Sequence, residues 1–492
     1  MFEAAELGRK LDKEAYRREV PRLRTALLKA QLSLRESKAF PVIVLIAGVD
    51  GAGKGETVNT LNEWMDPREI ETHALGAPTD EERDRPPLWR FWRVLPPKGR
   101  LAILFGSWYS GPIRAGADAL ADGAELDRSV EEINRLEKML ADEGVLILKF
   151  WFHLSKRQQR KRLKELEKSP AQRRRVGDSD WAHSRSYDEL RAVSEHVVRR
   201  TNKPHAHWVL VEGADARYRN VKVGKTVLQA LRKRLRNPGA RPRVVMPSRS
   251  PRVSDMTVLD GLDLDRALER PDYRERLHHY QGRLGLLSRR GKMRKRAVVA
   301  VFEGNDAAGK GGAIRRATAA LDARFYRVVP ISAPTEEELA RPYLWRFWRR
   351  LPRLGHMTIF DRSWYGRVLV ERVEGLAGET DWYRAYSEIN DFEEEMARHR
   401  IVIAKFWLAI DKDEQERRFK ERAKTGFKRH KLTEEDWRNR EKWDAYVAAI
   451  HDMVVQTSTE VAPWTLVEAN DKYFARIKVL RTLCERIEQG LA

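Results

Sequence analysis

The sequence has little cysteine and no long apolar run, and each absence excludes a class of protein. Cys484 is the single cysteine of the chain, so an intramolecular disulfide framework is excluded. No stretch approaches the roughly 18 consecutive apolar residues of a membrane span, and the first residues lack a basic segment followed by an apolar one. We therefore expect a cytoplasmic protein that has no membrane partner.

Length and charge indicate several domains and a polyanionic partner. The 492 residues are too many for one hydrophobic core, so at least two domains are expected. The formal net charge is +22 at pH 7, which suits binding to nucleic acid, an acidic membrane or a long phosphate polymer. Net charge alone does not choose among these partners.

The chain contains an internal repeat whose copies lie 256 positions apart, the separation of Gly48 from Gly304. The same separation relates 77–79 to 333–335, 88–93 to 344–349, 107–109 to 363–365, 132–134 to 388–390, 149–151 to 405–407, and 210–212 to 466–468. We predict two copies of one domain, at 1–236 and 257–492, paired as an internal pseudo-dimer. The segment 237–256 is rich in Pro, Arg and Ser, which predicts an extended linker.

Short apolar runs alternate with longer helical patterns in each copy. In the second copy the predicted strands are 297–302, 327–331, 357–360, 401–408 and 465–467, and the predicted helices are 312–321, 382–399, 414–424, 434–456 and 476–488. Nearly continuous hydrophobicity is typical of parallel strands that are buried on both faces. The alternation predicts a three-layer α/β domain with ligands at the carboxyl ends of the strands.

One segment of the second copy predicts a strand, a phosphate-binding loop and a helix in succession. The apolar run 298–302 precedes a glycine-bounded loop, and the spacing from Gly304 to Lys310 is that of a P-loop. In such a loop the backbone N–H groups and the helix N-terminus converge on a phosphate, and the lysine adds a positive charge. The predicted phosphate-binding residues of the loop are Gly304, Asn305, Ala307, Ala308, Gly309, Lys310 and Gly311.

The loop departs from the usual pattern at Gly311, where a hydroxyl would ordinarily hold a magnesium ion. Another residue must carry the metal, and the carboxylate of Asp306 lies within the loop itself. Asp361 directly follows an apolar strand and is the predicted second metal anchor, although a helix N-cap would explain it as well. Arg362 and Arg367 would neutralise charge on a transferred phosphoryl group.

The first copy retains its P-loop but lacks this set of charges. Phe105, Gly106 and Gly111 stand where the second copy has Asp361, Arg362 and Arg367. Phosphoryl transfer depends on such positioned charges. We therefore predict that the first copy is inactive or very weakly active and has become a structural partner, one still able to bind anions.

A basic stretch at 417–431 follows the fourth strand of the second copy. Its dense charge and the glycine at position 426 are typical of a lid that closes over phosphates, and a solvated helix face is the alternative. Leu166 of the first copy replaces Arg422.

The segment 344–349 interleaves tryptophan and arginine, for which core packing is favoured over nucleic-acid stacking. Glu388, Asn390 and Glu393 are expected at a helix surface or an interface, and the histidines lack the spacing of a zinc site.

The motifs at 304–310, at 360–367 and at 420–429 resemble those of the second family of polyphosphate kinases. The resemblance covers both repeats. It implies a fold similar to that of thymidylate kinases, and phosphoryl transfer between inorganic polyphosphate and nucleotides with magnesium, manganese being the other candidate ion. Residue by residue it implies Lys310 on phosphate, Asp306 and Asp361 around the metal, Arg362, Arg367 and Glu371 in the site, and Arg422, Lys424, Lys428 and Arg429 in the lid.

Fused, two-copy members of that family resemble the chain most closely, and they are polyphosphate:AMP phosphotransferases. The resemblance implies AMP as the acceptor, ADP as the product, and a reversible reaction. An ATP-dependent nucleoside monophosphate kinase stays open as an alternative, and so does a nucleic-acid-binding P-loop module. The acidic pair Asp306 and Asp361 argues against the last, because carboxylates repel phosphate unless a metal lies between them. A homo-oligomer of the chain is a further expectation.

Overall fold

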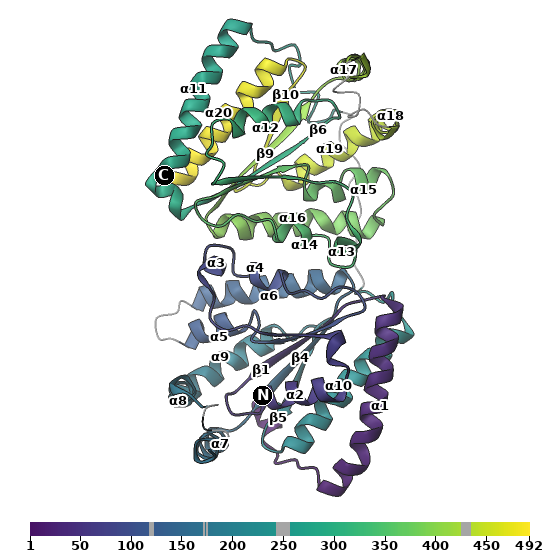
Figure 1. Ribbon diagram of the computed structural model, residues 1–492, viewed down its shortest axis with the longest axis vertical. Coiled ribbons are helices and arrows are strands. Elements are labelled where there is room, and N and C mark those ends of the chain that lie inside the picture. The colour runs from purple at the N-terminus through teal and green to yellow at the C-terminus, as the bar shows by residue number, and fades with distance from the viewer. Residues whose placement is uncertain (118–122, 171–172, 174–175, 243–255, 425–433) are drawn as a thin grey trace. The chain divides into compact units, whose positions relative to one another are not determined.

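The chain folds into two compact units, each built on a parallel sheet between layers of helices (Figure 1). The computed structural model describes residues 1–492 apart from 118–122, 171–172, 174–175, 243–255 and 425–433. The first unit comprises Met1–Pro78, Arg90–Arg243 and Thr335–Trp345, and the second comprises Thr79–Trp89, Val244–Pro334 and Arg346–Ala492. Each unit therefore contains the sheet of one repeat.

The secondary structure alternates between strands and helices along both repeats. The first contains η1 (Phe2–Ala5), α1 (Lys13–Ser37), β1 (Val42–Gly48), α2 (Lys54–Trp64), η2 (Pro67–Glu69), β2 (Ile70–Ala74), α3 (Asp80–Arg83), α4 (Trp89–Trp92), β3 (Leu101–Phe105), α5 (Ser110–Ala117), α6 (Gly123–Asp142), β4 (Leu146–His153), α7 (Lys156–Lys168), α8 (Asp178–Arg185), α9 (Tyr187–Arg200), β5 (Trp208–Glu212) and α10 (Ala216–Arg236). The second contains α11 (Arg270–Arg289), η4 (Gly291–Lys295), β6 (Ala297–Gly304), α12 (Lys310–Thr318), β7 (Tyr326–Pro330), α13 (Glu336–Leu339), α14 (Trp345–Trp348), β8 (Met357–Asp361), η5 (Trp364–Arg367), α15 (Val370–Val373), α16 (Glu379–Arg398), β9 (Ile401–Ala409), α17 (Lys412–Lys424), α18 (Glu434–Glu441), α19 (Trp443–Thr457), β10 (Trp464–Glu468) and α20 (Lys472–Leu491).

The two sheets have the same strand order, which confirms the predicted α/β fold. The orders are β2-β3-β1-β4-β5 and β7-β8-β6-β9-β10, and all the strand pairs are parallel. Phe302 of β6 is opposite both Asp361 of β8 and Phe406 of β9. The carboxyl ends of the three central strands of the second sheet therefore meet at one edge, where the P-loop begins.

The predicted strands of the second repeat are confirmed, with boundary shifts of a few residues. One helix prediction is wrong, because the single helix expected at 434–456 is two helices, α18 and α19, which are separated at Lys442. The tryptophan-rich segment packs in a core, as predicted: Phe347 contacts Phe360 and Trp364, and Trp348 contacts Phe392.

The expectation that Glu393 lies at a helix surface or an interface is also wrong. Glu388 is 7% exposed and pairs with Arg384, and Glu393 is fully buried. Glu393 binds the ammonium group of Lys405, a lysine in the interior of β9, at 2.7 Å. A buried charge needs a partner of opposite charge. Lys405 lies within an apolar strand, so the sequence already indicated that a buried acidic partner such as Glu393 was needed.

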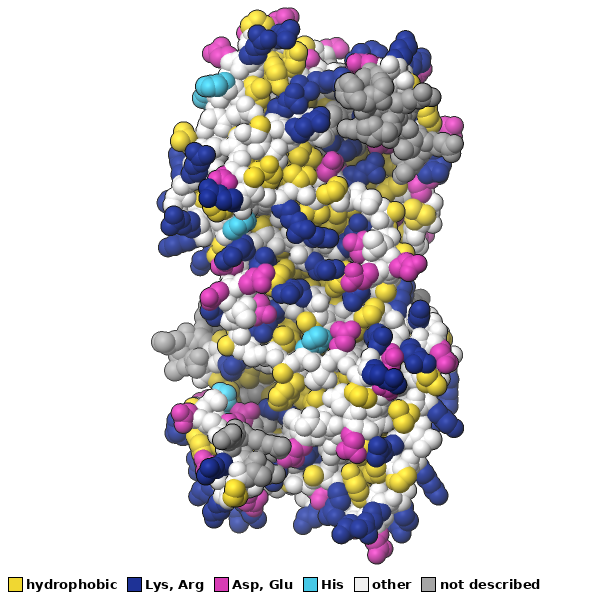
Figure 2. Space-filling model, in the orientation of Figure 1, with side chains coloured by type: hydrophobic (Ala, Val, Ile, Leu, Met, Phe, Trp, Pro, Cys, Tyr) yellow, Lys and Arg dark blue, Asp and Glu magenta, His cyan; other side chains and the backbone are white. Residues whose placement is uncertain are grey.

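Basic side chains are spread over the face shown in Figure 2 and are interspersed with acidic ones. Among the described residues, no helix combines the length and the apolar character that crossing a membrane would need.

Candidate active site

The P-loop of the second repeat is a tight backbone turn that only particular residues can form. Gly304 has a φ of +150°, and a Cβ atom there would lie 2.4 Å from the carbonyl oxygen of Leu408. Gly309 has a φ of +105° and caps α12. The first N–H groups of a helix have no acceptor within the helix. The N–H groups at the start of α12 are thus placed to bind an anion.

The ammonium group of Lys310 is surrounded by oxygen atoms and acidic groups. Its Nζ donates to the carbonyl oxygen of Gly304 at 2.6 Å and to that of Asn305 at 3.3 Å. Burial lowers the pKa of Lys310, and the negative charges of Asp306, Asp361 and Glu303 oppose that shift. Both predicted metal anchors therefore act on the same ammonium group.

The carboxylate of Asp306 is held from two sides. Arg362 Nη2 donates to Oδ1 at 3.1 Å, and Asn439 Nδ2 donates to Oδ2 at 2.9 Å. Burial alone would raise the pKa of Asp306, but the charges of Lys310 and Arg362 outweigh it, and the pKa lies below its ordinary value. Asp306 is therefore an anion at neutral pH, which is the form that binds a cation.

Asp361 is the last residue of β8, between the ends of β6 and β7. Its alternative explanation as a helix N-cap does not hold, because Ser363 caps η5 and its hydroxyl accepts from the N–H of Tyr365 at 3.3 Å. The negative charge of Asp361 opposes the lowering of the Lys310 pKa by burial, so Asp361 lies near the P-loop lysine.

Glu303 belongs to this acidic group, although the sequence analysis missed it. It is 5% exposed at the end of β6, and Ser363 Oγ donates to its Oε1 at 2.8 Å. Burial raises the pKa of Glu303, against the opposing charge of Lys310. The sequence held one sign of this role: Glu303 is acidic, whereas the matching residue of the first repeat is Ala47.

Two site residues have a left-handed backbone that ordinarily favours glycine. Ala307 has a φ of +66° and Arg362 a φ of +65°. The first repeat has Gly51 and Gly106 at these two positions, with φ values of +79° and +83°. Such strain persists where the surrounding structure enforces it, and it is common at functional sites.

Of the remaining predicted loop residues, one contributes its side chain to the loop and the other two offer only their backbone. Asn305 Oδ1 accepts from the N–H of Ile410 at 3.3 Å, so this side chain holds the loop to the end of β9. Ala308 is 2% exposed within the core and offers only its backbone. Gly311 has open space around the position of a Cβ atom.

The predicted lid begins with a helix that is anchored to the P-loop. Gln415 Nε2 of α17 donates to the carbonyl oxygen of Asp306 at 3.2 Å, and Arg418 Nη1 donates to that of Ala307 at 2.9 Å. Arg422 and Lys424 lie in the last turn of α17. Lys428 and Arg429 lie outside the described residues. Arg367, in η5, pairs with Glu371 at 2.9 Å.

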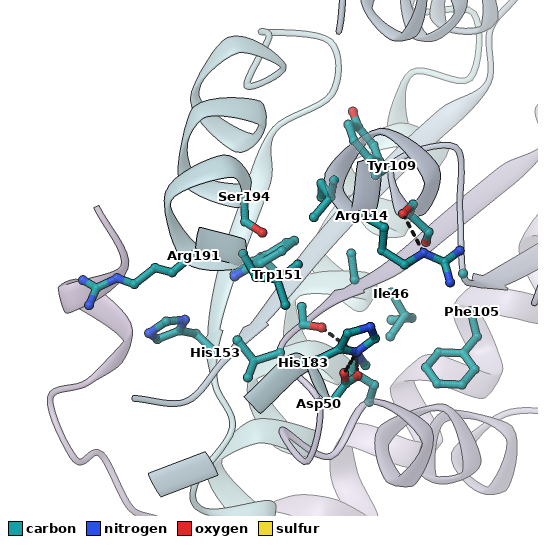
Figure 3. Close-up of a pocket in the computed structure, with 18 of the residues that line it drawn as sticks. Ile46, Asp50, Phe105, Tyr109, Arg114, Trp151, His153, His183, Arg191 and Ser194 are labelled. Atoms are coloured by element: carbon teal, nitrogen blue, oxygen red, sulfur yellow. Dashed lines mark hydrogen bonds and ion pairs between the residues drawn. The ribbon is translucent and has the colours of Figure 1, made fainter. Parts of the chain in front are cut away.

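In the P-loop of the first repeat, the aspartate is bonded to the loop lysine and to a histidine. Lys54 Nζ donates to Asp50 Oδ1 at 3.0 Å, and His183 of α8 bonds to Asp50 Oδ2 at 2.7 Å (Figure 3). His183 occupies the position of Asn439, so a side chain from the helix after the lid contacts the loop aspartate in both repeats.

Comparison with known proteins identifies the family. The family described as Polyphosphate kinase 2 (PPK2) matches residues 10–238 and 267–491. The chain belongs to the polyphosphate kinase 2 family. It is similar to two proteins named polyphosphate:AMP phosphotransferase, with 56% identity to one from Pseudomonas aeruginosa over 99% of both chains, and 52% identity to one from Pseudomonas syringae over 100% of this chain and 99% of the relative.

A solved structure of the family has the same fold over the full length. It is a crystal structure of a protein described as polyphosphate kinase 2 from Pseudomonas aeruginosa PA01, with 53% identity and a TM-score of 0.89, covering 100% of this chain and 99% of that chain. The tandem arrangement of two polyphosphate kinase 2 domains is therefore shared with relatives of the same length.

Proposed function

We propose that the chain transfers the terminal phosphoryl group of inorganic polyphosphate to AMP, giving ADP, at a site in the second repeat. The observation that carries the proposal is the set of opposed charges around Lys310, formed by Glu303, Asp306, Asp361 and Arg362. Phosphoryl transfer is catalysed mainly by positioning and charge stabilisation, which such a set supplies. The repeats 1–236 and 257–492, joined by 237–256, are the proposed functional domains.

Each predicted site residue has a proposed role. Lys310 and the N–H groups at the start of α12 would hold phosphate oxygens. Arg362 and Arg367 would neutralise charge on the transferred group, and Arg422 and Lys424, with Lys428 and Arg429, would bind the polymer. Glu371 orients Arg367 through their ion pair of 2.9 Å.

A divalent cation, with magnesium proposed, fits the two aspartates. Among the described residues no group of three or more His, Cys, Asp or Glu side chains is arranged to hold a metal. Magnesium is commonly bound by one or two carboxylates together with phosphate oxygens and water, so Asp306 and Asp361 form a suitable donor set. The ion, when bound, would reduce the negative charge of the phosphate groups.

The donor and the acceptor rest on different observations. The net charge of +22 and the basic end of α17 favour a long polyanion over one short nucleotide tail as donor. AMP is proposed as the acceptor because the similar full-length proteins are named for it. An ATP-dependent kinase would instead need ATP as the phosphoryl source.

The proposal is tested by incubating the protein with AMP, magnesium and polyphosphate in the absence of ATP. We expect ADP to form, and we expect Asp361→Ala to reduce the rate by at least about 1,000-fold, the scale seen when key transition-state charges are removed. Thermal melting of the variant checks that it is folded. Near-normal turnover by Asp361→Ala would contradict the site, and absence of ADP with the unaltered chain would contradict the reaction.

A further inference from the structure

Two hydrogen bonds in series join the loop aspartate of the second unit to helices outside the P-loop motif. Asn439 lies in α18, and its Nδ2 donates to Asp306 Oδ2 at 2.9 Å. The hydroxyl of Tyr446, in α19, donates to Asn439 Oδ1 at 3.2 Å. The series therefore runs from α19 through α18 to the P-loop.

The bond from Tyr446 fixes which way the amide of Asn439 faces. One end of an amide group donates hydrogen bonds and the other accepts them, and the group can be turned over within the same space. With the hydroxyl donating to Oδ1, the NH₂ end faces the carboxylate of Asp306. The reversed amide would place two acceptor oxygens against each other. The hydroxyl thus selects the orientation in which Asn439 stabilises Asp306.

Packing against α17 supports α18 at the place from which Asn439 reaches the loop. Arg440 Nη2 donates to Glu416 Oε2 of α17 at 2.7 Å, and the ring centroid of Trp437 lies 5.2 Å from that of Phe419 in the same helix. Two side chains of α17 are in turn bonded to backbone oxygens of the P-loop. The position of Asn439 is therefore set by the same elements that hold the loop.

The two repeats bind the other carboxylate oxygen of the loop aspartate differently. In the first repeat Lys54 Nζ binds Asp50 Oδ1 at 3.0 Å, so the loop lysine and the loop aspartate are paired with each other. In the second repeat Arg362 binds Asp306 Oδ1 at 3.1 Å, and among the described residues no ion pair joins Lys310 to Asp306. The lysine and the aspartate of the second loop can thus each serve a separate partner.

The tyrosine of the series occurs in the second repeat only. Leu190 stands at the matching position of the first repeat and has no hydroxyl to orient a side chain. Contacts that serve the shared fold recur in both repeats. For example, Asn390 Nδ2 donates to a backbone oxygen of α19 at 2.9 Å, and Asn134 Nδ2 donates to one of α9 at 3.4 Å. The bond from Tyr446 does not recur, which indicates a task specific to the second repeat.

We propose that Asn439, oriented by Tyr446, is a positioning residue for the divalent cation that Asp306 binds. A neutral amide fixes the carboxylate without adding positive charge, so the charge of Asp306 stays available to the ion. Each carboxylate oxygen has two lone pairs, so the bond to Asn439 leaves Oδ2 able to accept a second partner. The inference rests on the proposed function, because it takes Asp306 and Asp361 as the metal anchors.

Binding of Mn²⁺ to the full chain, measured from the electron paramagnetic resonance signal of the free ion, tests this role without turnover. We expect the unaltered protein to bind one ion that Asp361→Ala loses. Asn439→Ala should weaken the binding of this ion by about tenfold or more, the scale seen when a partner that orients a metal ligand is removed. The magnesium concentration for half-maximal ADP formation should rise by a similar factor, while the rate at saturating magnesium falls less.

Asn390→Ala is the matched control, since it removes an asparagine hydrogen bond of the same length, 2.9 Å, that does not involve the loop aspartate. It should leave the affinity for Mn²⁺ unchanged. Tyr446→Phe should weaken binding by about threefold, and it should add nothing in the Asn439→Ala background, because the hydroxyl acts only through the amide. Thermal melting checks that all the variants are folded.

The outcomes separate this inference from the proposed function. Equal effects of Asn439→Ala and Asn390→Ala on Mn²⁺ binding would overturn the inference, and so would additive losses in the double variant. If the variants respond as described but the unaltered chain forms no ADP, the positioning role stands and the proposed reaction fails. If ADP forms and Asn439→Ala binds Mn²⁺ as the unaltered chain does, the inference alone fails. If no bound ion depends on Asp361, the proposed metal site fails and the inference with it.

Discussion

At the scale of single residues, the second repeat has backbone strain at two positions where the first repeat has glycine. Ala307 and Arg362 hold φ values of +66° and +65°, whereas Gly51 and Gly106 adopt this region in the first repeat. A left-handed backbone costs a non-glycine residue about 1–2 kcal/mol. Arg362 therefore occupies an unfavourable position from which its guanidinium reaches Asp306 at 3.1 Å.

We predict that Arg362→Gly separates stability from activity. The substitution relieves backbone strain, but it also removes the ion pair with Asp306 and adds conformational freedom to the unfolded chain, so the free energy of unfolding should change by less than about 1 kcal/mol. Activity should drop by at least about 100-fold, because a charge facing the phosphoryl group is lost. Chemical denaturation and an ADP-formation assay measure the two effects.

Ala307→Gly is the matched control for this substitution. It relieves the same kind of strain at the next left-handed position and removes no charge, so activity should stay within about tenfold of the unaltered protein. Full activity in Arg362→Gly would contradict the role given to the guanidinium.

His183 and Asn439 make equivalent bonds to their loop aspartates, but only His183 can titrate. Its hydrogen bond to Asp50 raises the pKa of His183, while burial opposes the shift. A raised pKa stabilises the fold fully below the ordinary histidine pKa of about 6.5, and this contribution is lost as pH rises through the folded-state value.

We therefore predict that the first unit becomes less stable as pH rises from about 6 to 9, by less than about 1 kcal/mol because His183 is partly exposed. His183→Asn, which copies the second repeat, should flatten this dependence. Denaturation midpoints measured across the pH range provide the check, and an unchanged slope in the variant would rule out His183 as the cause.

The site residues that the sequence revealed are those within one motif. The loop spacing marked Asp306 and Lys310, and the end of an apolar strand marked Asp361. Asn439 was missed because it reaches Asp306 from a helix 133 positions away, and no local pattern reports such a contact.

At the scale of elements, both sheets are fastened by the same buried ion pair. Lys405 of β9 contacts Glu393 of α16 at 2.7 Å, and Lys149 of β4 contacts Glu137 of α6 at 2.7 Å. Burial raises the pKa of Glu393 and lowers that of Lys405, and their mutual attraction opposes both shifts. The shared pair belongs to the fold, since it also occurs in the repeat that has Ala47, Phe105 and Gly106 in place of Glu303, Asp361 and Arg362.

Lys405→Met should destabilise the second unit by about 3–5 kcal/mol, because Glu393 is left buried without a counter-ion. Adding Glu393→Leu should recover a large part of the loss. Lys420→Met removes an exposed ion pair of α17 and should change stability by less than about 1 kcal/mol. Urea denaturation of the unaltered protein and the three variants measures these effects. An equal effect of the two single lysine substitutions would contradict a special role for burial.

Strands that are buried along their whole length were predictable from the sequence, whereas the boundaries of charged helices were less so. The strands were predicted correctly because both of their faces are buried, so their sequences are nearly unbroken apolar runs. The segment 434–456 read as one helix because no proline or glycine interrupts it, and the separation at Lys442 has no local signal in the sequence. Glu393 read as a surface residue because its partner lies on another element.

At the scale of the whole molecule, one fold occurs twice with two sets of charges. Both sheets have the same strand order, yet Ala47, Phe105 and Gly106 replace Glu303, Asp361 and Arg362. The duplication was predictable because the offset of 256 positions holds along the repeat. The bonds from Tyr446 through Asn439 to Asp306 were not, since they join residues on separate elements.

The most direct test compares the same substitution in the two P-loops, with ADP formation from AMP and polyphosphate as the measurement. Lys310→Ala should reduce the rate by at least about 1,000-fold, because it removes the central cation of the charge set. Lys54→Ala, at the matching position, should stay within about threefold of the unaltered protein, with thermal melting confirming that both variants are folded. A comparable loss in both variants would contradict the assignment of catalysis to the second repeat alone.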